Sequence, residues 1–268
     1  MREVDKSTLQ RLGETVSAFP VHRVPLDAPW DWLALGWRDL CRVPFVSLAY
    51  GGVFALAAWA MTFGLNLLEL QSLILVLAGG FMLVGPLLAV GLYEASRRLE
   101  RDERITLSEA IAAGMHAKGR LGFFGAVLLF AFLVWVQLAF LLLMLFLGGS
   151  TVPNPSDFVH TLLFTSEGRA LLVAGTAAGA VLAAIIFSIS AVSVPLLLVR
   201  DVSAVTAVMT SLRAVGTNTG AMLLWAVLIA GFMVLGLLSL FIGLVVAFPL
   251  VGHATWHAFR ALVDLDGA

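Results

Sequence analysis

Few side chains in this sequence could do chemistry. The candidate functional residues are Glu94, Arg98, Gln137, His253 and His257. Because His253 and His257 lie four residues apart, a helix would present both imidazoles on one face, as a metal ion or a haem iron requires. A haem between two helices also needs a histidine on the facing helix, but His22, His116 and His160 fall in a tail or in loops. We therefore interpret the pair as polar anchors at a membrane surface, and we expect no metal ion, haem or other cofactor.

Glu94 lies where a long apolar segment ends and a charged segment, residues 97–104, begins. An acidic residue at such an edge could relay protons or hold a cation. Arg98 follows four residues later, however, and this spacing is typical of an ordinary ion pair on a helix. We favour the ion pair, and we regard Glu94 as the first residue to mutate in a test of function.

Gln137 is the one strongly polar side chain in the middle of an apolar segment, residues 121–147. It could line a pathway through a helix bundle. It could also form a hydrogen bond to a neighbouring helix, such as the one that carries Ser188, Ser190 and Ser193. We favour the second, structural interpretation.

The sequence contains no motif of a common enzyme class. We find no glycine-rich phosphate loop, no zinc-ligand spacing and no Ser-His-Asp set. The single cysteine, Cys41, excludes an internal disulfide and a cysteine-based metal site. Acidic residues nearly cancel the positive charge of residues 97–120, so we expect no nucleic-acid partner. We predict that the protein is not an enzyme.

The composition predicts the elements that must position these residues. Hydrophobic residues make up 60% of the 268 residues and charged residues 12%, whereas in a soluble domain about a quarter of the residues are charged. Several apolar segments exceed the roughly 20 residues that cross a bilayer. The chain is therefore expected to be an all-α, polytopic membrane protein, with the lipid bilayer as its permanent partner.

We predict six transmembrane helices, connected as three hairpins. The expected spans are about residues 43–67, 72–93, 121–147, 170–199, 219–237 and 240–259. They form one membrane domain, residues 30–262, between an N-terminal tail, residues 1–29, and a C-terminal tail, residues 263–268.

Each hairpin is expected to follow a short amphipathic helix that lies in the membrane interface. The apolar faces of these three helices are Trp30, Leu33, Ala34, Trp37 and Leu40; Leu107, Ile111 and Met115; and Val202, Val205, Met209 and Leu212. Thr106 and Glu109 have the spacing of a capping box at the start of the second helix.

Each returning span contains one proline, namely Pro86, Pro195 or Pro249. Proline lacks a backbone N–H and kinks a helix, so we expect Pro86 to kink the second span near Met82. The similar surroundings of the three prolines indicate that the hairpin is an internal repeat.

The distribution of basic residues predicts the orientation. With six spans and the N-terminus in the cytoplasm, all 16 Lys and Arg residues except Arg169 fall on the cytoplasmic side, in agreement with the positive-inside rule. The first thirty residues contain no hydrophobic region of the kind found in a cleavable signal. We therefore place both termini in the cytoplasm.

Several segments resemble those of an uncharacterised family of bacterial integral membrane proteins, catalogued as domain of unknown function 2189. Three of them are Gly36–Leu40, Ser47–Gly51 and Gly80–Arg98, and the later resemblance consists of two stretches, Asn218–Trp225 and Pro249–His257. The resemblance covers roughly residues 30–262 and implies a six-span protein of the bacterial cytoplasmic membrane, with no established activity.

Three functions remain open at this point. The scarcity of charge within the spans and the abundance of small residues favour a structural or accessory protein, which binds a partner complex or lipids or associates with itself. The alternative is a transporter or channel for a small solute. A haem-bearing respiratory subunit is the third possibility, which the positions of the histidines disfavour.

Overall fold

The computed structural model describes residues 18–116, 118–148 and 158–265, and the regular elements in these ranges are helices, as predicted. Residues 1–17 and 266–268 of the two predicted tails lie outside the described residues, as do residues 149–157 and the side chains of Met115 and His116. The helices are α2 (Ala28–Arg42), α3 (Pro44–Leu67), α4 (Ser72–Leu88), α5 (Val90–Leu99), α6 (Leu107–His116), α7 (Lys118–Leu147), α8 (Phe158–Phe164), α9 (Ser166–Ser190), α10 (Ser193–Val199), α11 (Ala204–Thr217), α12 (Thr219–Leu238) and α13 (Leu244–Leu262).

Five of the predicted spans correspond to helices that are long and apolar enough to cross a membrane. Within the described residues these are Pro44–Leu67, Ser72–Leu99, Leu121–Leu147, Ser166–Val199 and Thr219–Leu238. The sixth predicted span corresponds to α13, which does not qualify. Its 19 residues include His253, His257 and Arg260, which lower its mean hydropathy.

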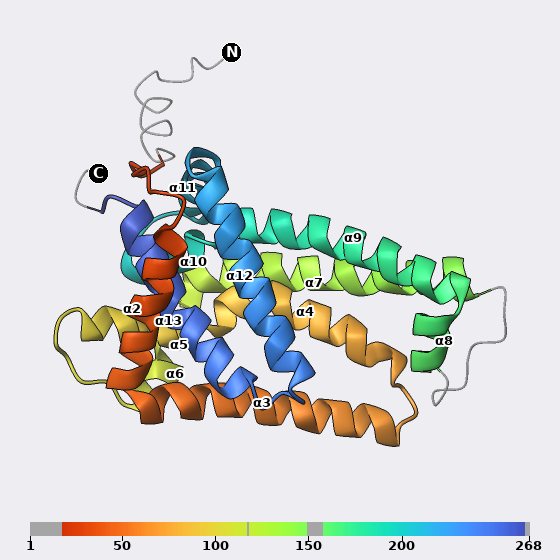
Figure 1. Ribbon diagram of the computed structural model, residues 1–268. Coiled ribbons are helices and arrows are strands. Elements are labelled where there is room, and N and C mark those ends of the chain that lie inside the picture. Colours follow the sequence, from red (N-terminus) through yellow and green to blue (C-terminus); the bar gives the residue numbers. More distant parts are fainter. Residues whose placement is uncertain (1–17, 117, 149–157, 266–268) are drawn as a thin grey trace, which may run out of the picture.

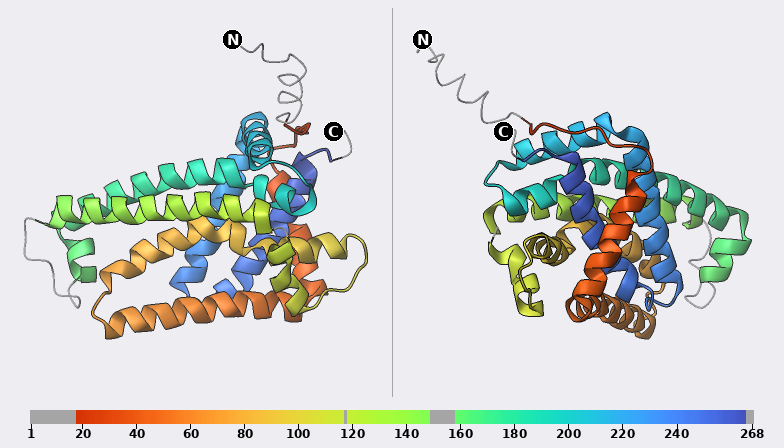
Figure 2. Two further views of the ribbon diagram at one scale, coloured as in Figure 1. Left: turned by 180° about the vertical axis from the view of Figure 1, so that it is seen from behind. Right: turned by 60° about the vertical axis from the view of Figure 1, so that its left-hand side comes forward.

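Four long helices, α3, α4, α7 and α9, extend from one end of the molecule (Figure 1). The shorter helices α2, α5, α6, α10 and α11 gather at that end, as both views in Figure 2 also show. There α13 packs against α2, α3 and α5. We call this part of the molecule the cap end.

The first predicted hairpin is open, because α3 packs on α13 more extensively than on α4. Gly51 permits the close approach, since a Cβ at that position would overlap the carbonyl oxygen of Val245. Pro249 frees this carbonyl, because it lacks the N–H that would bond to it. Beside this contact, Tyr50 of α3 stacks on Phe248 of α13 with ring centroids 6.4 Å apart. α4 packs instead on α7 and α9.

Pro86 lies within α4, and a break follows it. α4 continues through Met82 and Pro86 to Leu88, and α5 begins at Val90, so the kink that the sequence places near Met82 stays a prediction. The Tyr50 hydroxyl donates a hydrogen bond to the Leu88 carbonyl at 2.7 Å. A side chain from α3 therefore satisfies the backbone group that the break exposes.

Pro195 also coincides with a break, between the end of α9 at Ser190 and the start of α10 at Ser193. Ser211 of α11 forms hydrogen bonds with backbone groups on both sides of this break. Its hydroxyl accepts a hydrogen bond from the Val192 N–H at 3.3 Å and donates one to the Ser188 carbonyl at 2.7 Å. Pro249, in contrast, lies within α13 without interrupting it.

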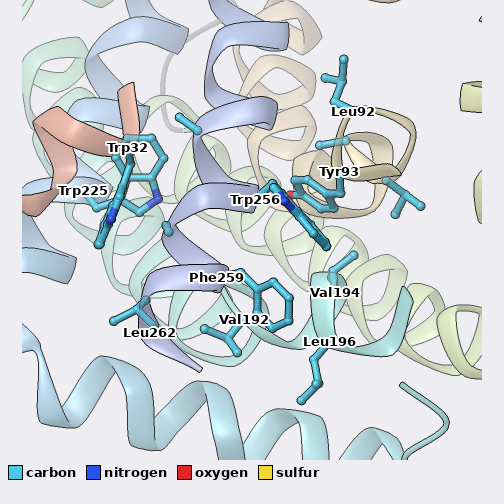
Figure 3. Packing of buried hydrophobic residues seen from close by; sticks show 14 of the residues in the cluster. Trp32, Leu92, Tyr93, Val192, Val194, Leu196, Trp225, Trp256, Phe259 and Leu262 are labelled. Carbon is cyan, nitrogen blue, oxygen red and sulfur yellow. The ribbon is translucent and has the colours of Figure 1, made fainter. Parts of the chain in front are cut away.

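Most residues of α13 are buried, and aromatic side chains pack on both sides of this helix (Figure 3). Trp32 of α2 and Trp225 of α12 lie on one side and meet edge to face, with ring centroids 5.8 Å apart. Trp256 of α13 points to the other side, toward Tyr93 of α5. α13 is therefore the central helix of the cap end.

Two half-buried aromatic side chains of α7 pack against α4 and α9. Phe132 lies against Gly80, where an added Cβ would overlap its ring. Trp135 lies against Gly79 and Gly179, and its indole N–H donates to the Val76 carbonyl at 2.7 Å. Glycine permits this close approach of α4 and α9 to α7.

Short helices precede α3, α7 and α12, as predicted, and α11 presents an apolar surface. Its predicted apolar residues Val205, Met209 and Leu212 are exposed, whereas small residues such as Ala207 and Ala214 face the bundle. The predicted capping box before α6 is also confirmed. The Thr106 N–H donates to Glu109 at 2.8 Å, and the Glu109 N–H donates to the Thr106 hydroxyl at 3.3 Å.

The predicted apolar face of α2 is divided between the surface and the bundle. Trp30, Ala34 and Trp37 are exposed, whereas Leu33 and Leu40 are buried, as is Trp32. The reason is that α13 packs along α2 and covers the face that contains Trp32 and Gly36.

The described residues near the two ends of the chain are hydrogen-bonded to each other. The His22 N–H donates to the Leu262 carbonyl at 2.9 Å, and the Asp264 N–H donates to the Pro20 carbonyl at 3.1 Å. These bonds flank an antiparallel bridge between Val21 and Val263. Residues 20–22 and 262–264 therefore lie on the same side of the molecule.

Candidate functional site

Five buried side chains form a hydrogen-bonded network at the cap end. Ser47 Oγ lies 2.9 Å from Nε2 of His253, and Ser96 Oγ lies 2.8 Å from Nδ1 of the same ring. Ser96 donates to Oδ2 of Asp39 at 2.8 Å, and the same oxygen lies 2.7 Å from Nε2 of His257. We call these residues the buried polar network. They join α2, α3, α5 and α13.

The hydrogen-bond partners define the donors in this network. The hydroxyl hydrogen of Ser96 goes to Asp39, so the Ser96 oxygen accepts from His253 Nδ1–H. His253 Nε2 then accepts from the Ser47 hydroxyl, because a neutral imidazole has one donor and one acceptor. His257 donates its Nε2–H to the Asp39 carboxylate. In this arrangement the ring of His253 uses both nitrogens.

Asp39 is held as a carboxylate although it is only 1% exposed. Burial by itself raises its pKa, but the hydrogen bonds from His257 and Ser96 outweigh burial and lower the pKa below its ordinary value of 3.8. A carboxylate that accepts several hydrogen bonds is stabilised in its charged form. The network therefore contains a buried negative charge at neutral pH.

The local structure explains how these residues meet. His253 and His257 lie one turn apart on α13, so both face α2 and its neighbours. Gly36 lies one turn before Asp39, and a Cβ there would overlap the backbone of Ala254. α2 and α13 therefore approach closely enough for Asp39 to reach His257.

Glu94 and Arg98 belong to a separate, charged cluster at the junction of α5 and α6. The predicted Glu94–Arg98 ion pair is confirmed at 2.9 Å, and Arg97 forms a second pair with Glu94 at 2.6 Å. Arg98 also bonds to Glu109 at 2.8 Å. Glu109 accepts from Arg98 and Thr106, and these bonds lower its pKa to about 2. These ion pairs and hydrogen bonds hold α5 and α6 together.

Residues of the segment 97–104 also contact α13 and α2. The indole N–H of Trp256 donates to Glu100 at 2.8 Å, and Arg260 lies 3.4 Å from the same carboxylate. Arg42 pairs with Asp102 at 2.9 Å. The charged segment is therefore attached to the same helices that the buried polar network joins.

Gln137 faces outward from α7. The predicted bond to the serines of α9 and α10 was wrong, since Ser188 and Ser193 donate to the carbonyls of Ala184 and Ile189 in their own segment. Phe132 and Trp135 of α7 occupy the side toward α4 and α9. No residue that the structure describes forms a hydrogen bond to the Gln137 side chain.

The structure corrects our interpretation of the two histidines. They are not anchors at a membrane surface, because His253 is fully buried and His257 is only 7% exposed. Our statement that the sequence contains no Ser-His-Asp set was also incomplete. Ser47, His253 and Asp39 come from distant parts of the chain, and Ser96 connects the last two.

One signal in the sequence could have found the network. Asp39, Ser47 and Ser96 each lie in one of the segments that carry the family resemblance, and so do both histidines. We had given roles to the histidines alone, because a serine or an aspartate in a helix has no spacing that identifies its partner.

The buried polar network can transfer a proton but cannot contact a substrate in this conformation. A hydroxyl bonded to an imidazole is the pair found in nucleophilic catalysis, yet Ser47 is fully buried. Both nitrogens of His253 are engaged, so neither is available to a haem iron or other metal. Within the described residues, no group of three or more His, Cys, Asp and Glu side chains could hold a metal ion.

Comparison with known proteins confirms the family resemblance over part of the chain. Residues 73–199 match the model of a family described as predicted integral membrane protein, domain of unknown function 2189. This range extends from α4 to the end of α10. No curated protein matches the chain, and no solved structure matches it.

Proposed function

We propose that this multi-pass integral membrane protein is a structural or accessory protein, which binds another membrane component and does not catalyse a reaction. One observation carries the proposal. At the depth of Gln137, near the middle of the Leu121–Leu147 segment, the polar side chain faces outward, and the aromatic side chains of Phe132 and Trp135 lie between α7 and its neighbours α4 and α9.

This arrangement favours binding over transport. A polar solute needs polar groups or water along its path, because lipid and apolar side chains replace none of its hydrogen bonds. Between α4, α7 and α9 the aromatic side chains lie directly on Gly79, Gly80 and Gly179. The polar group at this depth is instead directed at whatever surrounds the protein.

Lipids are a second component that the surface would bind. Val205, Met209 and Leu212 form an exposed apolar face on α11, and Trp30 and Trp37 are exposed on α2. Apolar and tryptophan side chains on short helices are typical of helices that lie in the membrane interface. We infer that α2 and α11 lie there.

We infer further that the chain crosses the bacterial cytoplasmic membrane six times, with both termini in the cytoplasm. The bridge between Val21 and Val263 supports an even number of crossings, so α13 would be the return of α12. Its two histidines are compatible with this position, because α2, α3 and α5 shield them from lipid. The distribution of Lys and Arg residues supports the cytoplasmic placement.

Purification in mild detergent followed by mass spectrometry tests the accessory function. We expect a second membrane component, protein or lipid, to co-purify in stoichiometric amount with the wild-type protein. The variant Val227→Leu, which changes an exposed apolar residue in the middle of α12, is expected to bind the same component as the wild-type protein. Wild-type protein that purifies without any bound component would contradict the proposal.

Transport of a small solute, coupled to protons, is the second candidate. The buried polar network favours it, because hydrogen bonds connect His257 to Ser47 through Asp39, Ser96 and His253. Proton uptake by proteoliposomes, followed with a trapped pH dye, tests this function. Uptake that is lost in Asp39→Asn and kept in Asp31→Asn would favour transport over the accessory function.

A further inference from the structure

We propose that α7 is a dimerisation helix, and that Gln137 of one copy bonds to Gln137 of a second copy of this chain. The inference rests on the proposed function and names the partner of the same outward-facing surface. An amide side chain without a hydrogen-bond partner is unfavourable at the middle of a membrane, because lipid replaces none of the hydrogen bonds that it forms with water.

The residues around Gln137 have the pattern of a helix–helix seam. A broad side of α7 is exposed, and within it five side chains recur at alternating spacings of three and four, namely Phe130, Leu133, Gln137, Phe140 and Met144. We call this set the Gln137 seam. The spacing is that of the a and d positions of a heptad, with Phe130, Gln137 and Met144 at the a positions. The common left-handed packing of membrane helices uses this pattern.

The opposite face of α7 is already occupied. Leu128 and Ala131 are buried there, and Phe132 and Trp135 pack on the glycines of α4 and α9. Views from opposite sides show α7 and α12 at opposite faces of the molecule (Figures 1 and 2). The Gln137 seam lies opposite the face of α7 that packs on α4 and α9, so it is open to a neighbour.

A second copy is the partner that the chemistry fits. Two copies in one membrane have the same orientation, so a two-fold axis along the membrane normal makes their α7 helices parallel. In a parallel pair, each a position faces its own counterpart. A carboxamide both donates and accepts hydrogen bonds. The two Gln137 side chains would therefore satisfy each other, which an apolar helix from another protein could not do.

Disulfide cross-linking in native membranes tests this proposal. In a Cys41→Ser background, Met144→Cys places a thiol at an a position and leaves Gln137 intact. We expect an oxidant to link this variant into a dimer. Val227→Cys, on the exposed face of α12, is the matched control and is expected to remain a monomer.

Replacement of Gln137 tests whether its carboxamide group is the cause of dimerisation. Gln137→Leu in the Met144→Cys background is expected to weaken dimerisation on the order of tenfold, and Gln137→Asn is expected to keep most of it. Equal cross-linking of the Met144→Cys and Val227→Cys variants would overturn the proposal, and so would a cross-linked product that contains a different protein. In the second case the accessory function would stand, whereas a protein without any partner would refute both.

Discussion

Asp39 is the residue on which the buried polar network depends. Its carboxylate accepts from both Ser96 and His257. Removal of an acceptor leaves buried donors unsatisfied, which costs more than the hydrogen bonds contribute. Asp39→Ala is therefore expected to destabilise the fold by about 3 kcal/mol, measured by unfolding in a denaturing detergent. Asp31→Ala, an exposed aspartate on the same helix, is the control, and an equal effect of both changes would contradict this role.

The lowered pKa of Asp39 predicts how stability depends on pH. A group whose pKa is lower in the folded state stabilises the fold above its unfolded pKa, and the contribution is lost as the pH falls through the folded pKa. For Asp39 the loss begins near its ordinary value of 3.8. We expect the free energy of unfolding to decrease below about pH 4. This decrease is expected to be smaller in Asp39→Asn than in the wild-type protein. An identical decline in wild type and variant would show that other carboxylates cause it.

At the residue scale, the predictions that are confirmed concern interactions between close neighbours in the chain. The Glu94–Arg98 pair and the Thr106–Glu109 capping box follow from fixed helical spacings, and both are confirmed. The bond between Ser47 and His253 joins residues 206 positions apart. No periodicity identifies such a partner, because it depends on how two helices pack.

At the scale of elements, two glycines of α4 distinguish packing from helix propensity. A Cβ at position 80 would overlap the ring of Phe132, whereas nothing lies within 4 Å of one at position 85. Gly80→Ala is therefore expected to destabilise the protein by about 1–3 kcal/mol. Gly85→Ala is expected to be neutral or slightly stabilising. Thermal unfolding of both variants measures the difference, and an equal loss in both would show that α4 and α7 do not pack through Gly80.

The elements themselves were largely predictable, but their breaks were not. Apolar length and capping residues are local features, so the helices α3, α7 and α12 begin close to their predicted positions. At the break after Leu88, the Leu88 carbonyl accepts a hydrogen bond from the hydroxyl of Tyr50, which reaches across from another helix. Proline indicates that a helix will bend, but its neighbours determine where.

At the scale of the whole molecule, the sidedness of three positions tests the proposed topology. Cys41 is exposed on α2. A membrane-impermeant thiol reagent is expected to label Cys41 only in inside-out vesicles. In a Cys41→Ser background, Arg260→Cys should be labelled from the same side and Arg169→Cys from the other. Labelling of positions 41 and 260 from opposite sides would mean an odd number of crossings.

Of the six predicted spans, five are confirmed as helices long and apolar enough to cross a membrane, because apolarity is a property of each segment alone. α13 does not meet this criterion, and its two histidines, which lower its hydropathy, are covered by other helices. The outward direction of Gln137 was also beyond prediction. The side of α7 that faces α4 and α9 depends on how Phe132 and Trp135 meet their glycines.

The most direct test of the central claim is native mass spectrometry of the protein released from lipid nanodiscs. The claim is that the polar group at mid-membrane depth serves association. We expect the wild-type protein to give a species of twice the 28.6 kDa chain mass. The Gln137→Leu variant is expected to give mainly the single chain. If wild type and Gln137→Leu both appear as single chains without a bound component, the outward-facing Gln137 has no role in association and the account is wrong.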